Sequence, residues 1–446
     1  MAQVSAAAGG PGGALRRLAA RLPIDSTIAG NASFLIGDKL LRLVVALVTN
    51  ALIARELGPA SYGLFNWAVA LVALLGAIGT VGLPDILVRE FVQKRDRADE
   101  LEAAAIWMRL GGGALVLLIA VAASALLRPG EAHAAALVAV VALSQIVMAF
   151  DAIDQRLQAD YIVRPVVLIR AGSYLGFAVL RIVAALQGAD VLVFGLLFSA
   201  ELGCVALLLN LRARRTGAAP RLGRATRATA AVLWRDGAPM LARLLAIGVY
   251  MRADQLLLAR LLDDRAVGIY AAAARLSEIW YLVPVSLAAA FAPKLNRSFA
   301  QSRAEYDREL AQLMRLAVGG SALFAAAVTI AAPLVVRLLY GPAYAASAAV
   351  LSVHCWAGVV VTAGTLATNW FVNTGLLKYG FYQTVLGVVV SVGLNLLLIP
   401  RLGVMGAAVA VLLSQAVSAV LANALWPQTR PVFWIQLRAM ALLGPR

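Results

Sequence analysis

Twelve long apolar segments follow one another along this chain, and a few of them carry ionisable side chains near their middle. About twenty apolar residues cross the hydrocarbon core of a bilayer, and 62% of the 446 residues are hydrophobic. A soluble domain of this size could not cover so much apolar surface. We therefore predict an all-α polytopic membrane protein with spanning helices at 28–54, 61–82, 104–127, 133–151, 163–186, 190–211, 234–260, 266–291, 311–338, 345–374, 380–399 and 404–426.

Basic residues are distributed unequally between the two sides of this predicted bundle. The chain ends and the even-numbered loops hold most of the Lys and Arg residues, whereas the odd-numbered loops hold only Arg55, Arg128, Arg260, Arg265, Arg337 and Arg401. Cytoplasmic loops of membrane proteins carry an excess of Lys and Arg. The pattern therefore predicts that both termini are cytoplasmic. It also explains the net charge of +16 without a nucleic-acid partner.

The longest internal linker divides the predicted helices into two groups of six. It is rich in arginine and contains Gly217, Pro220 and Gly223. We expect two pseudo-symmetric six-helix lobes around a central cavity. The predicted parts are a disordered cytoplasmic tail at 1–27, an N-lobe at 28–211, a basic cytoplasmic linker at 212–233, a C-lobe at 234–426 and an interfacial cytoplasmic tail at 427–446.

A short internal repeat supports this division. Arg55 and Gly63, at the junction of the first and second segments, recur at the same spacing as Arg260 and Gly268, at the junction of the seventh and eighth. Each group of six begins on the cytoplasmic side. The repeats are therefore predicted to be parallel and related by an axis along the membrane normal.

Ionisable side chains are concentrated in the first, seventh and eighth segments. A charge at bilayer depth costs roughly 3 kcal/mol or more, so such residues usually line a water-filled path or a cavity. Because several of them are basic, they predict a cavity for a large anionic ligand. We add the polar and aromatic side chains of Asn66 and Trp67 in the second segment. The predicted cavity residues are Lys39, Arg42, Arg243, Arg252, Arg275, Asn66 and Trp67.

Structural explanations remain open for several of these residues. Arg42 could pair with Asp38, and Arg275 with Glu278, within one helix. Arg243 could extend to the inner interface, and Trp67 could serve as an anchor or in packing. Uncharged polar residues in the apolar segments, including Asn369 and Asn423, are expected to form hydrogen bonds between helices.

Three acidic residues are candidates for ion coupling. Asp254 is the first choice, because it lies in the seventh segment near Arg252 and could bind and release a proton. Asp38 and Glu278 are weaker candidates, since each has a basic neighbour on its own helix. Asp254 could instead serve only to hold helices together. We expect no metal site and no cofactor, because His133 and His354 are far apart in the sequence and neither has an acidic cluster near it.

Four sequence motifs resemble a known family. LGPASYGLF at 57–65 is similar to the start of polysaccharide biosynthesis proteins, the lipid-linked oligosaccharide (O-antigen type) flippases of the multidrug/oligosaccharidyl-lipid/polysaccharide exporter superfamily. DQLLL at 254–258, followed by VGIY at 267–270, resembles the family's seventh and eighth helices. Its later junctions resemble YGPAY at 340–344 and NLLLIP at 395–400 with GVMGAA at 403–408.

This resemblance implies a fold and a cargo. The implied fold is an inverted V of two lobes whose cavity is lined by helices one, two, seven and eight. The implied cargo is an undecaprenyl-pyrophosphate-linked oligosaccharide, moved by alternating access from the inner to the outer leaflet of the bacterial cytoplasmic membrane. Expected partners are membrane lipids, together with the glycosyltransferases and polysaccharide polymerase of the same pathway.

Two other functions are weighed against the flippase. An ion-coupled small-molecule exporter of the multidrug type would need a compact, mostly apolar cavity, and the surplus of arginines argues against it. A membrane polysaccharide polymerase would need a large external loop with catalytic residues, and the predicted external loops are short. We therefore expect a transporter and not an enzyme.

Overall fold

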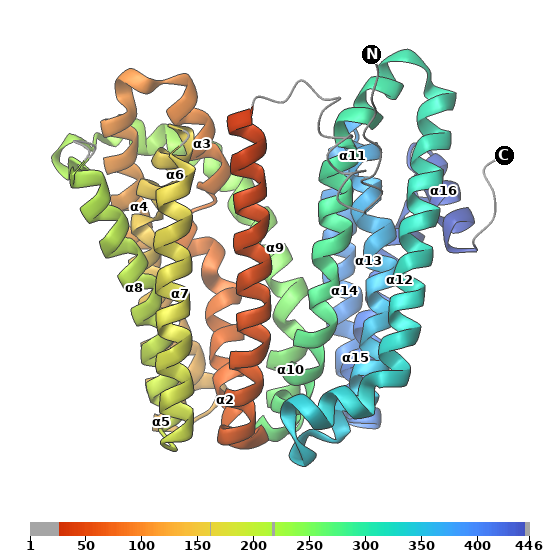
Figure 1. Cartoon of the computed structure of the whole chain (residues 1–446), viewed down its shortest axis with the longest axis horizontal. Helices are drawn as coiled ribbons and strands as arrows, with labels where there is room; N and C mark the ends of the chain where they lie inside the picture. Colours follow the sequence, from red (N-terminus) through yellow and green to blue (C-terminus); the bar gives the residue numbers. More distant parts are fainter. Residues whose placement is uncertain (1–25, 161, 216–218, 442–446) are drawn as a thin grey trace, which may run out of the picture.

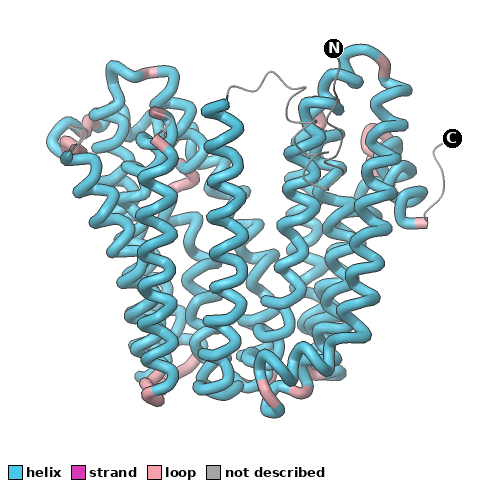
Figure 2. The backbone as a smooth tube through the Cα atoms, viewed as in Figure 1, coloured by secondary structure: helices cyan, strands magenta, loops and turns pink. Residues whose placement is uncertain are grey.

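The computed structural model describes residues 26–160, 162–215 and 219–441, with side chains described from Arg42 onward except that of residue 163. This part of the chain contains helices joined by short turns and no strand (Figure 2). The main helices are α2 (Ser26–Thr80), α3 (Pro84–Gln93), α4 (Ala98–Leu127), α5 (Ala132–Val147), α6 (Asp151–Ala159), α7 (Val163–Leu186), α8 (Val191–Arg215), α9 (Arg227–Leu261), α10 (Asp264–Glu278), α11 (Leu282–Gln301), α12 (Arg303–Tyr340), α13 (Ala346–Asn373), α14 (Leu377–Leu402), α15 (Val404–Gln415) and α16 (Arg430–Met440). The prediction of an all-helical membrane protein is confirmed.

Ten helical stretches of the described chain are long and apolar enough to cross a membrane. They do not match the twelve predicted segments one for one, for two reasons. First, α2 runs through the first two predicted segments, with a kink at Gly58 (φ 71°, ψ 168°) just before Pro59. Second, the apolar stretches of α9 are interrupted by Arg243, Arg252 and Asp254, so α9 is not one of the ten. Twelve crossings therefore remain a prediction.

The helices form two groups that lie side by side (Figure 1). We call α2–α8 the N-terminal bundle and α9–α16 the C-terminal bundle. Within the first group α4 packs on α5, α5 on α8, and α2 on α7; within the second α12 packs on α13, α14 on α15, and α9 on α14. Helix α2 also packs against α9 and α10, which joins the groups.

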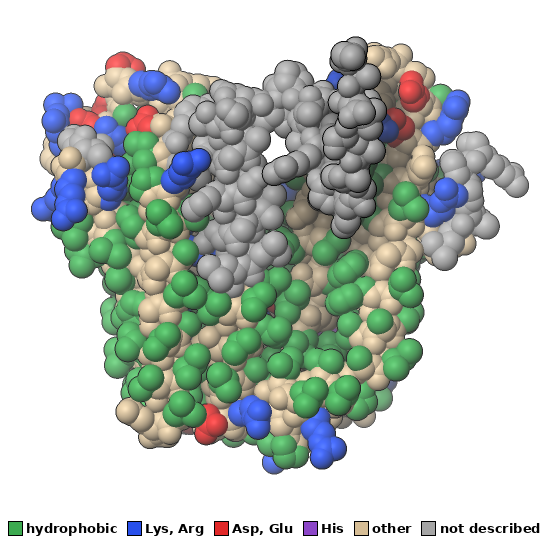
Figure 3. All heavy atoms as spheres, in the orientation of Figure 1, with side chains coloured by type: hydrophobic (Ala, Val, Ile, Leu, Met, Phe, Trp, Pro, Cys, Tyr) green, Lys and Arg blue, Asp and Glu red, His purple; other side chains and the backbone are tan. Residues whose placement is uncertain are grey.

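The surface is that of a membrane protein. Large apolar side chains such as Leu126 (83% exposed) and Ile330 (83% exposed) point outward. Hydrophobic side chains cover the middle of the face seen in Figure 3, and Lys and Arg gather mainly at the end where the termini lie. We call this the terminal end and the other the distal end. So many apolar side chains on the outer surface are stable only if the hydrocarbon core of a bilayer surrounds them.

Two of the uncharged polar residues form the hydrogen bonds between helices that the sequence predicts. The Asn369 amide donates to the Ala288 carbonyl at 3.1 Å. The Asn423 amide donates to Gln436 of α16 at 2.8 Å, and Gln436 in turn donates to the Ala419 carbonyl at 2.9 Å. The segment predicted as an interfacial tail at 427–446 therefore contains a helix, α16, and the buried amide of Gln436 attaches this helix to the rest of the C-terminal bundle.

Candidate functional site

Arg42 is the first predicted cavity residue whose side chain the structure describes. Asp38 and Lys39 lie on α2, and their side chains are outside the described ones. Arg42 is half-buried, and its guanidinium carbon lies 5.8 Å from the centre of the Tyr174 ring on α7. Arg42 therefore faces α7, inside the N-terminal bundle.

Arg275 of α10 approaches the same tyrosine from the other bundle. Tyr174 lies within electrostatic range of Arg275, Arg42 and the Arg181–Glu201 ion pair, whose nitrogen and oxygen are 2.6 Å apart. Arg275 forms no ion pair with Glu278 or any other carboxylate among the described side chains, so the expected local pair is absent there. Tyr174 is therefore contacted by Arg42 of its own bundle and lies within electrostatic range of Arg275 of the other.

A cavity of about 390 Å³ lies within the C-terminal bundle. Arg243 of α9 is one of its lining residues, together with aromatic side chains, hydroxyls and amides of α13, α14, α15 and the turn that follows α15. Its lining residues on α13 and α14 belong to the second half of α13 and the first turns of α14. These parts of the two helices lie toward the terminal end (Figure 1). Arg252 is half-buried on α9 and does not line this cavity.

Asp254 and Glu278 meet at a smaller cavity next to it. Asp254 is 7% exposed; its carboxylate accepts hydrogen bonds from the Tyr270 hydroxyl and from the Gln255 backbone N–H, the latter at 2.7 Å. Glu278 and His354 line the same small cavity. The imidazole of His354 lies 2.5 Å from the Ser277 hydroxyl. The structure therefore unites two of the three candidate coupling carboxylates, from α9 and α10.

Trp67 joins neither group, whereas Asn66 lies near Arg275, since both residues act on the Tyr62 side chain. The Asn66 amide donates to the Tyr62 carbonyl of its own helix at 2.8 Å. Trp67 is 1% exposed and lies at the distal end, where the Arg128 guanidinium carbon is 4.1 Å from its ring centre. Arg128 also binds Asp264 of α10 through both guanidinium nitrogens.

Several residues at these sites had no clear signal in the sequence. Tyr174 is one of eleven tyrosines and has no charged neighbour in the sequence within four residues except Arg170. His354 stands alone in an apolar segment. The hydroxyl and amide groups of the C-terminal cavity are single polar residues on different helices, and each alone is typical of interhelical hydrogen bonding. Only packing brings them together.

Comparison with known proteins agrees with this arrangement. The family model for polysaccharide biosynthesis proteins matches residues 28–299. No curated protein sequence matches the chain. Solved structures with a similar fold include a lipid II flippase MurJ in an inward closed conformation, and a multidrug resistance MATE family transporter in an inward-facing and an outward-facing conformation.

These three structures resemble the chain to different degrees. The MurJ structure has a TM-score of 0.70 at 12% identity, covering 92% of this chain and 91% of that one. The inward-facing MATE structure has a TM-score of 0.71 at 16% identity, covering 90% and 95%. The outward-facing MATE structure reaches 0.59 at 16% identity, covering 94% and 97%. The likeness shows the fold.

Proposed function

Because the chain belongs to the family of polysaccharide biosynthesis proteins, we propose that it is a flippase for an undecaprenyl-pyrophosphate-linked oligosaccharide. It would carry this lipid from the inner to the outer leaflet of the bacterial cytoplasmic membrane by alternating access. The multi-pass membrane architecture and the fold shared with flippases and transporters of the multidrug/oligosaccharidyl-lipid/polysaccharide exporter superfamily support this proposal.

One observation carries the proposal: Arg42 lies beside the Tyr174 ring, and Arg275 of the other bundle is close enough to act electrostatically on the same tyrosine. A pyrophosphate and a sugar chain cannot cross hydrocarbon without polar partners. A guanidinium group binds phosphate oxygens in a two-pronged geometry, which makes Arg the suitable partner. A pyrophosphate bound by both residues would connect the bundles and respond when they move. Lys39, on the same helix as Arg42, would add to this site.

The two bundles are the proposed moving lobes, with the linker 212–233 between them. Rocking of one bundle against the other would expose the arginines alternately to the two sides. Asp254 and Glu278 form the proposed coupling site, where binding and release of a cation would bias this equilibrium. Glycosyltransferases would supply the lipid-linked sugar on the inner side, and a polymerase would consume it on the outer side.

Charge reversal at the two arginines tests the proposal. We expect Arg42→Glu and Arg275→Glu each to abolish transport of the lipid-linked oligosaccharide in reconstituted vesicles, while Arg275→Lys keeps part of it. Arg401→Glu is the matched control, because Arg401 is exposed at the far end of α14. Size-exclusion profiles check that each variant is folded. Normal transport by both charge-reversal variants would disprove the arginine site.

The proposed orientation is tested separately by labelling. Single cysteines introduced near Gly188 and Pro342 should react with a membrane-impermeant reagent from outside the cell. A cysteine near Ala98 should react only after the inner side is opened. For these experiments Cys204 and Cys355 are first replaced by Ser or Ala. The reverse pattern of labelling would place the termini outside and contradict the distribution of basic residues.

A further inference from the structure

We propose that the cavity of the C-terminal bundle binds the sugar next to the pyrophosphate, as a site separate from Arg42 and Arg275. This inference rests on the proposed function and gives it a second binding site. The ligand would be a neutral or acidic sugar unit. The helices α9, α13, α14 and α15 and the turn after α15 supply the walls of this site.

The chemistry of the walls suits a carbohydrate. Hydrogen-bonding groups come from Thr365, Thr368, Thr384, Ser418, Gln383 and Gln415. Hydroxyls and amides can both donate and accept, as sugar hydroxyls do. Apolar faces come from Tyr250, Tyr281, Phe371 and Phe381, on which the C–H faces of a sugar ring can pack. Convergent polar groups within an otherwise apolar wall are typical of small-molecule sites.

Several of these polar groups keep capacity for a ligand. The side chains of Gln415 and Thr365 make no hydrogen bond to any other residue of the described chain. The Thr384 hydroxyl donates to the Gly380 carbonyl at 3.0 Å, so its oxygen can still accept. The Tyr250 and Ser418 hydroxyls lie 3.0 Å apart, and each retains a lone pair. A sugar could therefore bind without breaking existing hydrogen bonds.

Charge and size exclude other parts of the cargo from this cavity. Of the described residues that line it, Arg243 alone is charged, so it lacks the paired guanidinium groups that a pyrophosphate would need. Its volume of about 390 Å³ lies near the lower end of the usual range for small-molecule sites, roughly 300–1,000 Å³. A polyprenyl chain would leave the hydroxyls and amides without partners, which costs free energy.

The cavity also adjoins the proposed coupling carboxylates. Tyr250, Met251, Tyr281 and Gln415 line both this cavity and the small one that holds Asp254 and Glu278. A sugar in the larger cavity would contact the side chains that separate it from these acids. Occupancy of the sugar site could then be communicated to the coupling site by direct contact.

Gly380 offers a direct way to fill the cavity. Gly380 lines it, and a Cβ at this position would meet no atom within 4 Å, so a side chain would extend into open space. Gly393, further along α14, is equally open and lies on the exposed surface. Replacing either helical glycine by Leu improves helix propensity. Gly380→Leu therefore fills the cavity and Gly393→Leu does not, while both variants change helix propensity in the same way.

The test measures binding of two lipids to the full-length protein in nanodiscs. The probes are undecaprenyl pyrophosphate and the undecaprenyl-pyrophosphate-linked oligosaccharide isolated from the cells that make it. We expect the wild type to bind the second more tightly, and Gly380→Leu to lose about tenfold in affinity for it alone. Gly393→Leu should bind both lipids as the wild type does. Thr365→Val, which removes one hydroxyl at constant shape, should lose about threefold for the oligosaccharide lipid alone.

Each other outcome contradicts a specific part of this proposal. Equal affinity of the wild type for the two lipids, or unchanged oligosaccharide binding by Gly380→Leu, would overturn the sugar site and leave the flippase proposal intact. Failure of the wild type to bind either lipid would overturn both. A loss of binding of the hydrophobic cation ethidium in Gly380→Leu, with oligosaccharide binding unchanged, would make the cavity a drug site of an exporter.

Discussion

The two bundles contact each other in different ways at the distal and terminal ends of the molecule. At the distal end the backbones of α2 and α10 touch at Gly63 and Gly268, the glycines of the internal repeat. At the terminal end the contacts run through the first turns of α9 and the segment before it, where charged and hydroxyl side chains meet α4. The distal contact between α2 and α10 is therefore made by buried backbone, whereas the side-chain contacts of the terminal end include exposed ion pairs.

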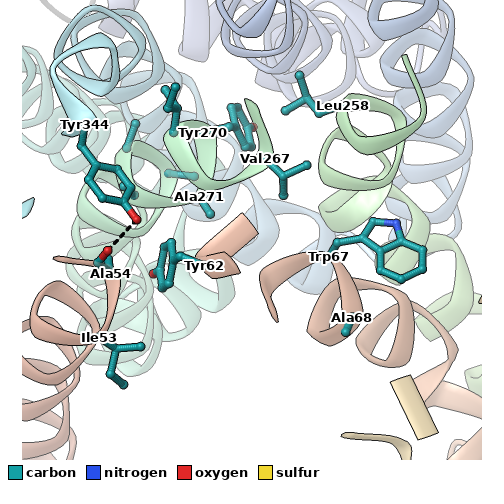
Figure 4. Packing of buried hydrophobic residues seen from close by; sticks show 14 of the residues in the cluster. Ile53, Ala54, Tyr62, Trp67, Ala68, Leu258, Val267, Tyr270, Ala271 and Tyr344 are labelled. Atoms are coloured by element: carbon teal, nitrogen blue, oxygen red, sulfur yellow. Dashed lines mark hydrogen bonds between the residues drawn. The ribbon is translucent and has the colours of Figure 1, made fainter. Parts of the chain in front are cut away.

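The distal contact combines backbone packing with specific polar bonds. Figure 4 shows Ala54, Tyr62, Tyr270 and Tyr344 at this interface, with the Tyr344 hydroxyl donating to the Ala54 carbonyl at 2.8 Å. The Arg128–Asp264 ion pair joins α4 to α10 nearby. If the two bundles move against each other as proposed, these distal contacts form a gate, and we expect them to break when the distal end opens.

At the terminal end, helix α9 of the C-terminal bundle packs against α2 and α4 of the N-terminal bundle. A Cβ at Gly237 of α9 would lie 2.7 Å from the Val81 carbonyl oxygen, so the start of α9 is pressed against the N-terminal bundle. Further along, α9 lines the C-terminal cavity through Arg243 and Tyr250. Pro239 lies between the two regions and lacks a backbone N–H, which weakens the helix there. Helix α9 can therefore bend at Pro239, whereas the contact between α2 and α10 at the distal end can change only if the two helices separate.

The largest effect is expected from a side chain inserted between α2 and α10, where the two helices touch at the distal end. A Cβ at Gly268 would lie 2.0 Å from the Pro59 carbonyl oxygen, and one at Gly63 would lie 1.7 Å from that of Asp264. We expect Gly268→Val to destabilise this state by about 3 kcal/mol and to abolish transport. Thermal unfolding and vesicle transport would measure both. Gly111→Val on α4, where a Cβ meets nothing within 4 Å, should have little effect on either.

The Arg128–Asp264 pair should have the next largest effect. Arg128 is held by Asp264 and stacks on Trp67, in a site where its side chain is 10% exposed. A hydrogen bond to a charged group contributes about 1.5–3 kcal/mol. We expect Arg128→Ala and Asp264→Ala each to shift spin-label distances across the distal end toward separation, and the double variant to add no further shift. Additive shifts would mean that the two residues do not act as a pair.

The sequence was sufficient to predict the helices, because apolar segments of sufficient length indicate them. It identified Gly63 and Gly268 only as matching positions of a repeat, and their contact depends on how α2 and α10 pack. The partner of Trp67 could not be predicted, since Arg128 lies far along the chain at the end of another helix. The meeting of Arg42, Arg275 and Tyr174 likewise depends on how α2, α7 and α10 pack, which periodicity does not determine.

A titratable contact beside the contact between α2 and α10 should have a smaller, conditional effect. Asp254 of α9 accepts a hydrogen bond from Tyr270, two residues beyond Gly268 on α10. We expect Asp254→Asn, which keeps the shape and removes the titration, to bind cargo normally but to transport it without pH dependence. Transport at several pH values in vesicles would show this. Unchanged pH dependence would leave Asp254 as a residue that only holds α9 to α10.

The smallest effect is expected at the terminal end. Asp99 of α4 lies within 2.9 Å of Arg156 and 3.2 Å of Arg224, and the Arg224 side chain is 57% exposed. Exposed ion pairs contribute at most about 1 kcal/mol and are screened by salt. Arg224→Ala should therefore leave transport and unfolding temperature close to those of the wild type, even at low salt. If Arg224→Ala abolished transport, the attachment of α9 would itself be a gate, and the two ends would have to be regarded as alternately locked.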